Sequence, residues 1–524
     1  MGRDGAPGIT APLRVPRLRM LLLVQLGVSV GVWMLVTVAQ WLLTRAGEPA
    51  SVVSAVQLAA SLPFFLLALP IAAVVDSAGH RRVLTGTALA LALAAALPPL
   101  AELAGVRGVP VLMGTVFLAG AGLAAVVLVW QALLPRLVAP DLLAVVPALD
   151  GAVFNGARAL GPVLGGGLLA WFGASPAFVA SAVLFGLCAV IAARYVPADA
   201  GTAPRQGSVR AAMGTAARFI RYSRWTRRLL LRATAFGVPA GCLWALLPVL
   251  ADERLDASTL EFGIVSGAVG IGAVFGTVAA MPLRARTSWN QFVALGSVAY
   301  AAVLAGLALG TRVELAVLLM VVAGAAWVGV QSTWMVAAHA VVPRWIRTRV
   351  IAFVMVVFQG SQAVGALLWG VLADRIGLVP TVLVAAAAML ASAIGVLRNG
   401  LRPSTGIAPD PAPARDDLAF PEGAPAGRVI VETTYRVEPD RVTAFLADVA
   451  AVRVSRLRLG ALRCTLTRPA GAAGTFVEFC VFRSWAEYLA QETERLTVPE
   501  HRLRLSVARH LAAEPELRVL VEPG

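Results

Sequence analysis

The sequence predicts an all-α membrane protein, in which twelve membrane-spanning helices form two six-helix repeats and a small α+β domain follows them. The first observation is composition: 59% of the 524 residues are hydrophobic and 14% are charged, too few charges for a surface that faces water. The second is that arginines recur between long apolar segments. The third is a repeat, because Phe154-Asn155-Gly156 returns 204 residues later as Phe358-Gln359-Gly360. A duplicated membrane bundle explains all three.

The membrane spans follow from windows that are poor in charge, each near the roughly 20 residues that cross a bilayer as a helix. We expect spans at 20–44, 51–75, 83–101, 108–135, 143–170, 176–195, 229–251, 260–283, 290–310, 313–341, 350–372 and 378–397. The fifth span carries both Asp150 and Arg158. The predicted domains are an N-terminal segment (1–17), a first bundle (18–196), a connector (197–228), a second bundle (229–400), a linker (401–427) and a C-terminal domain (428–524).

The distribution of arginines predicts the orientation. Up to Arg402, segments on the N-terminal side of the membrane hold 23 arginines, and segments on the other side hold five. Because positive residues are retained in the cytoplasm, we expect a multi-pass protein of the plasma membrane with both termini cytoplasmic. The same scatter argues that the net charge of +15 is not a phosphate-binding patch, so no nucleic-acid partner is expected.

The connector and the linker differ in character. Apolar residues recur at helical spacing over 209–228, among several arginines. This predicts an amphipathic helix on the inner membrane face, held by anionic membrane lipids; a plain solvated linker is the alternative. The linker is rich in proline and alanine, which predicts a flexible tether.

The C-terminal domain has strand and helix patterns in the order β-α-β-β-α-β, which is that of a ferredoxin-like domain. We expect strands at 429–437, 462–467, 475–482 and 516–521, and helices at 439–457, 484–496 and 499–511. Ser484 and Glu487 have the spacing of a capping box. Sheets of this kind often dimerise, so a homodimer through this domain is expected.

The cysteines predict no covalent or metal chemistry. Cys188, Cys242, Cys464 and Cys480 show no short paired spacing. We therefore expect reduced thiols that form neither a metal site nor a disulfide, and no cofactor.

The six-plus-six plan resembles the major facilitator superfamily over about residues 18–400. The loop Ala72-Ala-Val-Val-Asp76-Ser-Ala-Gly79-His-Arg81-Arg82 is similar to that superfamily's G-x-x-x-D-R-x-G-R-[KR] signature and retains Asp76, Gly79 and Arg81. The resemblance implies that Asp76 pairs with an arginine or a helix N-terminus of the other half and latches one conformation. A simple loop charge is the alternative.

A second motif bears on the direction of transport. The run Gly161-Pro162-x-x-Gly165-Gly166 resembles the fifth-helix signature of drug and proton antiporters in this superfamily, which implies export. A tight packing face without bearing on direction is the alternative. Asn155-x-x-Arg158, Trp33-Met34 and parts of the C-terminal domain resemble the branch that includes enterobactin (siderophore) exporters, although Val32 stands where that branch has an aspartate.

The substrate site of such a bundle lies near the midplane, between the halves. Tryptophans beside uncharged hydrogen-bonding groups suit an apolar or aromatic solute, and for any single tryptophan an interfacial anchor is the alternative. The candidate cavity residues are Gln25, Trp33, Gln40, Trp41, Trp130, Gln131, Trp244, Gln331 and Trp334.

Proton coupling needs a titratable group, and Asp150 and Asp76 are the candidates. Arg158 stands two helical turns from Asp150, about 12 Å along the axis and too far for a direct pair. An arginine in an apolar segment marks a functional site by default, here an ion pair or an anion site; hydrogen bonds to carbonyls of other helices are the alternative. The candidate coupling and conformational residues are Asp76, Gly79, Arg81, Arg82, Asp150, Asn155, Arg158, Gly161, Pro162, Gly165, Gly166, Gln359 and Gln362.

We therefore predict a secondary transporter, not an enzyme, that exports a small amphipathic molecule in exchange for protons. One alternative is a membrane-anchored enzyme acting through the C-terminal domain, which resembles small monooxygenase-like modules but offers only His501 and His510, with Tyr488 where related domains carry a histidine. Another is a membrane sensor or lipid-handling protein that kept the bundle without proton coupling.

Overall fold

A computed structural model describes residues 11–106, 108–137, 146–197, 209–401, 410–413, 427–472 and 474–521. The chain divides into two compact units. The first comprises residues 1–206, 232–333 and 356–399, and the second comprises 207–231, 334–355 and 400–524.

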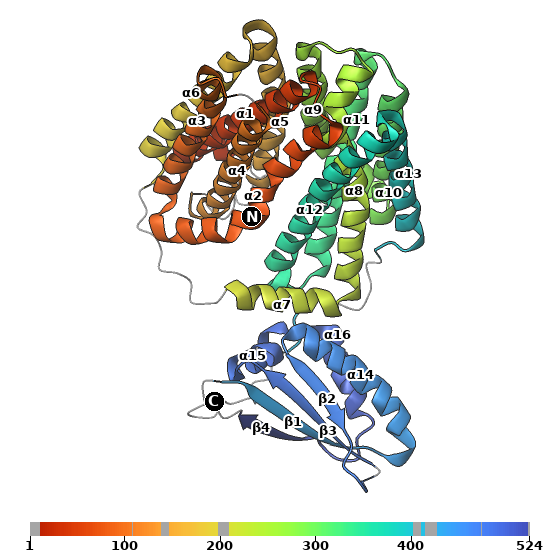
Figure 1. Cartoon of the computed structure of the whole chain (residues 1–524). Helices are drawn as coiled ribbons and strands as arrows, with labels where there is room; N and C mark the ends of the chain where they lie inside the picture. Colours follow the sequence, from red (N-terminus) through yellow and green to blue (C-terminus); the bar gives the residue numbers. More distant parts are fainter. Residues whose placement is uncertain are drawn as a thin grey trace, which may run out of the picture. The chain divides into compact units, whose positions relative to one another are not determined.

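The helical bundle contains the long helices of both repeats (Figure 1). The first half has α1 (Pro16–Arg45), α2 (Ala50–Ala78), α3 (His80–Leu103), α4 (Val109–Leu137), α5 (Val146–Phe172) and α6 (Ala174–Tyr195). The second half has α8 (Arg224–Glu253), α9 (Thr259–Arg286), α10 (Trp289–Leu309), α11 (Val313–Val341), α12 (Arg344–Ile376) and α13 (Leu378–Arg398). These helices lie where the spans were expected, with ends that differ by a few residues.

Eleven helices in the described part of the chain are long and apolar enough to cross a membrane. Helix α5 is not among them, although it occupies the fifth place in the first half. It carries the half-buried Asp150 and the buried Arg158, the two charges that set this span apart in the sequence. The protein is therefore a mostly helical membrane protein, in which α5 is the exception in composition.

The two halves repeat each other in packing as well as in sequence. Helix α2 packs on α4 where Gly120 lies so close to α2 that an added Cβ would be 2.0 Å from the Ala60 carbonyl oxygen. Gly324, which follows Gly120 by 204 residues, brings α11 equally close to the Val269 carbonyl oxygen of α9. Only glycine permits such approach of two helix backbones. The duplication thus holds at the level of single contacts.

The turns between the last two helices of each half also match. Gly173 joins α5 to α6 and Gly377 joins α12 to α13, and both have φ of 89°. This left-handed conformation is costly for other residues, so glycine is required at both turns.

The second unit contains a small sheet domain near the C-terminus (Figure 1). Its elements are β1 (Val429–Arg436), α14 (Val442–Leu459), β2 (Arg463–Thr467), β3 (Thr475–Phe482), α15 (Trp485–Ala490), a π-helical turn (Gln491–Arg495), α16 (Val498–Ala508) and β4 (Glu516–Val521). The strands form one antiparallel sheet in the order β2-β3-β1-β4. Tyr435, Phe445 and Phe476 lie in the core between the sheet and its helices.

Local capping differs from the expectation at one helix. The Ser484 hydroxyl accepts from the Glu487 N–H, as expected, but the Glu487 carboxylate pairs with Arg495 at 2.7 Å rather than completing a capping box. A complete box occurs at α16, where Thr497 and Glu500 cap each other. The Glu487 carboxylate therefore binds Arg495 instead of the Ser484 backbone N–H.

The connector helix α7 (Val209–Tyr222) is shorter than expected, because the chain turns at Ser223 and α8 begins at Arg224. Part of its apolar side is buried within the second unit: Ala216, Phe219 and Ile220 are buried, α7 packs on α14, and Phe219 makes an edge contact with Trp345. Met213 on the same side is 46% exposed, so contact with lipid stays a prediction for that residue. Of the expected tether, residues 410–413 are described, and there the Ala412 N–H donates to the Leu496 carbonyl oxygen at 2.8 Å.

Candidate functional site

The glycine run of α5 joins the two halves of the bundle. An added Cβ at Gly161 would lie 2.5 Å from the Trp33 Cβ of α1. At Gly166 it would lie 2.9 Å from both the Gly263 Cα and the Thr259 carbonyl oxygen of α9. The run therefore lets α5 contact α1 in its own half and α9 in the other half at backbone distance.

Helix α12 makes the corresponding contacts. An added Cβ at Gly365 would lie 2.4 Å from the Val238 carbonyl oxygen of α8, and at Gly370 it would lie 1.9 Å from the Ser54 hydroxyl of α2. Each of these two helices thus packs on the first helix of its own half and on the second helix of the other half.

Arg158 lies inside a cage of aromatic rings where the halves meet. Its Cζ atom lies 4.8 Å from the ring centre of Trp33, 5.4 Å from Phe154, 5.1 Å from Trp244 and 4.6 Å from Trp327. Those rings come from α1, α5, α8 and α11. Cation–π contacts of this length stabilise a desolvated guanidinium by about 2 kcal/mol or more each.

The cage supplies rings but few hydrogen-bond acceptors. Arg158 is 6% exposed, and neither its Nε nor its Nη1 has a hydrogen-bond partner among the described residues. The indole Nε1 atoms of Trp33 and Trp327 are also buried without a partner there. The expected alternative, hydrogen bonds from Arg158 to carbonyls of other helices, is therefore not seen for Nε and Nη1.

A small cavity of about 30 Å³ adjoins the cage, enough for one or two water molecules. Its lining comes from α1, α2, α5, α8 and α9 and consists of Trp33, Val36, Thr37, Gln40, Gln57, Arg158, Pro162, Trp244, Leu247, Pro248, Phe262 and Ser266. Trp33, Gln40 and Trp244 were candidate cavity residues, and Arg158 and Pro162 were candidate coupling residues. Thr37, Gln57, Ser266 and the cage ring of Trp327 were missed, because single polar or aromatic residues on long apolar helices carry no distinctive spacing.

A second polar cluster forms around Asp150, between α1, α4 and α5. The Gln25 side-chain amide donates to the Asp150 carboxylate, and the Trp130 side chain also hydrogen-bonds to it. Gln25 and Trp130, predicted to line the cavity, thus contact the predicted coupling residue instead.

The remaining candidates lie elsewhere. The Trp41 indole donates to the Thr259 hydroxyl at 2.9 Å and stacks on Phe262. The other candidates are Gln131, which is exposed; Gln331, which is half-buried; Trp334, which is buried; Asn155, which donates to the Gly151 carbonyl oxygen; and Gln362, which donates to Gln359. None of these is among the residues that line the described cavity.

The loop motif after the second span is only partly described. Gly79 has φ of 82° and ends α2, and Arg81 and Arg82 are exposed at the start of α3. The side chain of Asp76 lies outside the described residues, so its latch role stays a prediction.

Contacts at one end of the bundle join the halves. Arg45 at the end of α1 pairs with Asp252 at the end of α8, at 3.0 Å. The Gln40 amide of α1 donates to the carbonyl oxygen of Trp244, its own repeat counterpart 204 residues later, at 3.2 Å. The two halves therefore meet on the symmetry-related first helices, beside the cavity.

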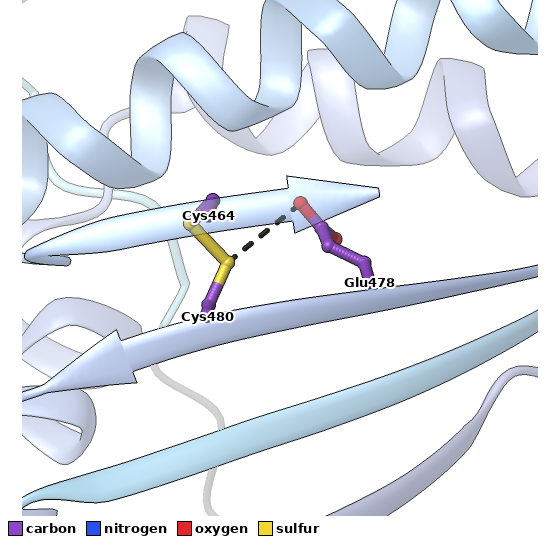
Figure 2. A group of neighbouring side chains, drawn as sticks. All are labelled: Cys464, Glu478 and Cys480. Atoms are coloured by element: carbon purple, nitrogen blue, oxygen red, sulfur yellow. Dashed lines mark hydrogen bonds between the residues drawn. A yellow bond between two sulfur atoms is a disulfide. The ribbon is translucent and has the colours of Figure 1, made fainter. Parts of the chain in front are cut away.

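The C-terminal domain corrects the expectation for two of the cysteines. Cys464 and Cys480 form a disulfide, with Glu478 beside them (Figure 2). They are direct cross-strand partners on β2 and β3, which explains the pairing despite a sequence separation of 16. Together with Glu478 they resemble a metal-ligand group, but both sulfurs are already bonded to each other. Cys188 and Cys242 are free and buried.

Buried ion pairs fill the space beside the disulfide. Arg456 pairs with the fully buried Glu478 at 3.0 Å, and the Tyr435 hydroxyl donates to the same carboxylate at 2.8 Å. Burial is the largest single influence and would lower the pKa of Arg456, but the Glu478 carboxylate together with Tyr435, Glu492 and Tyr488 outweighs it and raises that pKa. Glu492 pairs with Arg504, which holds the pKa of that carboxyl below its usual value against the opposing effect of burial.

The histidines considered for catalysis lie apart from this network. His510 contacts the Asp448 carboxylate at 3.0 Å, and His501 is half-buried on α16. Tyr488 is buried in the core against Phe482 and Trp485. Tyr488 therefore has a packing role, and His510 contacts a carboxylate on α14.

Comparisons with known proteins agree with the bundle. The family model of the transmembrane secretion effectors (MFS_3) matches residues 8–521. The nucleoside transporter NupG is similar in structure, with a TM-score of 0.61 at 12% identity over 73% of this chain and 98% of NupG. A bacterial homologue of the human lysosomal transporter Spinster gives 0.58 at 14% identity, over 74% of this chain and 95% of that one. The human organic anion transporter MFSD10 (TETRAN) gives 0.51 at 17% identity, over 72% and 99%. Among curated proteins, no sequence matches this chain.

Proposed function

Because the chain belongs to the transmembrane secretion effector family (MFS_3) and is thus a multi-pass membrane transporter of the major facilitator type, we propose that it exports a small amphipathic compound in exchange for protons. Siderophores, antibiotics and drug-like molecules are the proposed substrate classes. Alternating access would proceed by rocking of one six-helix half against the other around the cavity beside Arg158.

The observation that carries this proposal is the position of the caged arginine. Arg158 contacts aromatic rings from both halves, and the adjoining cavity is lined from both halves as well. The contacts of a group that touches both halves change when the halves move relative to each other. Substrate binding at such a group can therefore shift the equilibrium between the two conformations of a carrier. We propose Asp150 as the proton-linked carboxylate, because it lies on the same helix as Arg158, α5, and accepts a hydrogen bond from Gln25 of α1.

The orientation and environment form part of the proposal. The excess of arginines on one side supports cytoplasmic termini in the plasma membrane. Leu93 and Trp171 are 72% and 71% exposed on long apolar helices, as expected for residues that face membrane lipids. We propose that α5 also crosses the membrane, which brings the number of spans to twelve, and that its polar residues face the protein interior.

We propose a ferredoxin-like fold for the C-terminal domain and a homodimer through its β4 edge. The strand order β2-β3-β1-β4 supports the fold. Leu517 and Leu520 point to opposite faces of the edge strand β4, yet both are more than 40% exposed. An edge strand with apolar side chains pairs readily with a second copy. Light scattering of the full chain should give a dimer, and Leu517→Asp with Leu520→Asp should give a monomer.

Transport in proteoliposomes tests the function. The purified protein is reconstituted, a pH gradient is imposed, and a panel of siderophores, macrolides and lipophilic dyes is offered. We expect at least one compound to move in exchange for protons. Movement without protons would leave a uniporter, and movement of no compound would favour the sensor or lipid-handling alternative.

A further inference from the structure

We propose that Arg158 is a receptor for an anionic oxygen group of the transported molecule, so that the substrate is an organic anion with an aromatic or apolar body. This inference rests on the proposed transport function and narrows its substrate class. It follows from the charge, the unpaired donors and the composition of the cavity lining.

The first step concerns charge. Among the described residues, no carboxylate forms an ion pair with Arg158. Asp150, the acid on the same helix, is engaged by Gln25 and Trp130. Arg158 is 6% exposed, and the rings around its guanidinium attract the cation but carry no negative charge. The site therefore carries a net positive charge in a poorly solvated environment, which an incoming anion would neutralise.

The second step concerns hydrogen bonds. Four buried donor nitrogens of the cage have no acceptor among the described residues: Nε and Nη1 of Arg158, and Nε1 of Trp33 and Trp327. A buried donor without an acceptor costs about 1–3 kcal/mol, and more when the group is charged. All four groups are donors, so the missing partner is an acceptor. A carboxylate, which accepts several hydrogen bonds and bears the opposite charge, matches this deficit.

The third step concerns the cavity beside the cage. Its polar lining residues other than Arg158 are Thr37, Gln40, Gln57 and Ser266, all uncharged. The Ser266 hydroxyl is also buried without a hydrogen-bond partner in the described part of the chain. None of the described residues that line this cavity is acidic, so an anion entering it meets no like charge from them. The volume of about 30 Å³ admits only water-sized groups, and a larger anion requires the halves to separate, which links its binding to the transport cycle.

Paired probes test the proposal on the full-length protein in lipid nanodiscs. The probes are 4-nitrobenzoate and 4-nitrobenzamide, which share the ring and differ in the anionic group. Quenching of tryptophan fluorescence reports binding, because Trp33, Trp244 and Trp327 surround the site, and titration calorimetry checks it. We expect the carboxylate to bind at least tenfold more tightly than the amide in the unmodified protein, a comparison that needs no variant.

Substitutions locate the preference. Arg158→Gln should reduce the affinity for 4-nitrobenzoate at least tenfold and leave that for the amide nearly unchanged, and Arg158→Lys should keep part of the preference. The matched control is Arg284→Gln, since Arg284 lies over the Phe292 ring but donates to the Ser332 hydroxyl; this variant should keep the full preference.

Equal binding of both probes, binding of neither, or an unchanged preference in Arg158→Gln would overturn the anion site. The transport function is judged separately in proteoliposomes. A carboxylate preference that depends on Arg158, found with no transport of any compound, would refute the transport proposal alone. Transport by a protein without that preference would refute the anion site alone.

Discussion

Helices α5 and α12 hold equivalent places in the two halves, but they differ in chemistry. Both approach their neighbours through glycines at matching positions, Gly161 with Gly365 and Gly166 with Gly370. At the place of Arg158, however, α12 has Gln362, and at the place of Asp150 it has the buried Val354. The glycine contacts therefore occur in both halves, whereas a charge at these two positions occurs only in α5.

The polar groups of the two helices also differ in how they are satisfied. Gln362 donates to Gln359 one turn away on α12, at 3.3 Å. Arg158 keeps two donor nitrogens, Nε and Nη1, without a partner among the described residues. Helix α12 therefore satisfies its polar group within the helix, whereas α5 brings a cation with unpaired donors to the equivalent place in the other half.

Another buried arginine shows what a structural role looks like in this chain. Arg456 of the C-terminal domain is paired with Glu478, and its pKa is raised because that carboxylate and the neighbouring groups together outweigh the effect of burial. Arg158 has rings where Arg456 has an acid. Removing the acid that pairs with Arg456 should therefore be costly.

The largest effect is expected for Glu478→Gln, which leaves Arg456 buried without its counter-charge. Breaking a buried ion pair from one side costs roughly 3–5 kcal/mol, and Tyr435 loses a charged acceptor as well. Hydrogen exchange of strands β1 and β3 in the full chain should accelerate at least a hundredfold. Glu516→Gln is the control, because its pair with Arg436 is more than half exposed and contributes at most about 1 kcal/mol. Equal effects of the two variants would remove the contrast with Arg158.

The next effect tests the shared scaffold. Gly161→Ala and Gly365→Ala each place a Cβ within 2.5 Å of α1 or α8, and overpacking of this kind costs roughly 1–3 kcal/mol. We expect both variants to lose at least tenfold in transport, to a similar extent, and to unfold at lower temperature.

Gly186→Ala on α6 is the matched control, since an added Cβ there meets nothing within 4 Å. It should transport normally, and the better helix propensity of alanine should leave its stability unchanged or slightly higher. A large loss in only one of the two glycine variants would show that the halves are not equivalent in packing.

Asp150→Asn tests whether the charged helix carries the coupling. The amide keeps a contact with Gln25 but cannot carry a proton. Proton-driven transport should fall about tenfold while binding of 4-nitrobenzoate stays the same. Glu102→Gln is the control, because Glu102 accepts from Ser175 at the exposed end of α3. Coupling would have to be assigned elsewhere if Asp150→Asn moved protons at the normal rate.

The helices of the bundle were predictable from sequence, because a chain in lipid must satisfy its backbone within each span and therefore needs long uncharged stretches. The repeat was predictable from the spacing of Gly161 and Gly365. The residues that contact those glycines were not predictable, since Gly263 lies about a hundred residues from Gly166 and no sequence feature of either segment identifies the other as its neighbour. The same holds for Trp327, whose ring lies closest to Arg158 among the four of the cage.

The disulfide was missed although its signal was present. Cys464 and Cys480 lie at nearly equal distances from the middle of the predicted hairpin loop, so the expected strands already placed them opposite each other. The separation of two cysteines along the chain did not predict this disulfide, whereas the register of the hairpin strands would have predicted it.

The smallest effect is expected for Trp327→Leu, which sharpens the difference between α5 and α12. It removes the ring closest to Arg158, at 4.6 Å, and one of the four unpaired donors. A single desolvated cation–π contact contributes about 1–2 kcal/mol, but the remaining rings and the charge persist, so 4-nitrobenzoate should bind three- to tenfold more weakly. Trp171→Leu, at a residue that is 71% exposed, should bind as the unmodified protein does. If Trp327→Leu bound the carboxylate and the amide probes equally well, the aromatic rings rather than the guanidinium would determine the preference for the carboxylate. The functional difference between α5 and α12 would then lie in the shape of the site more than in its charge.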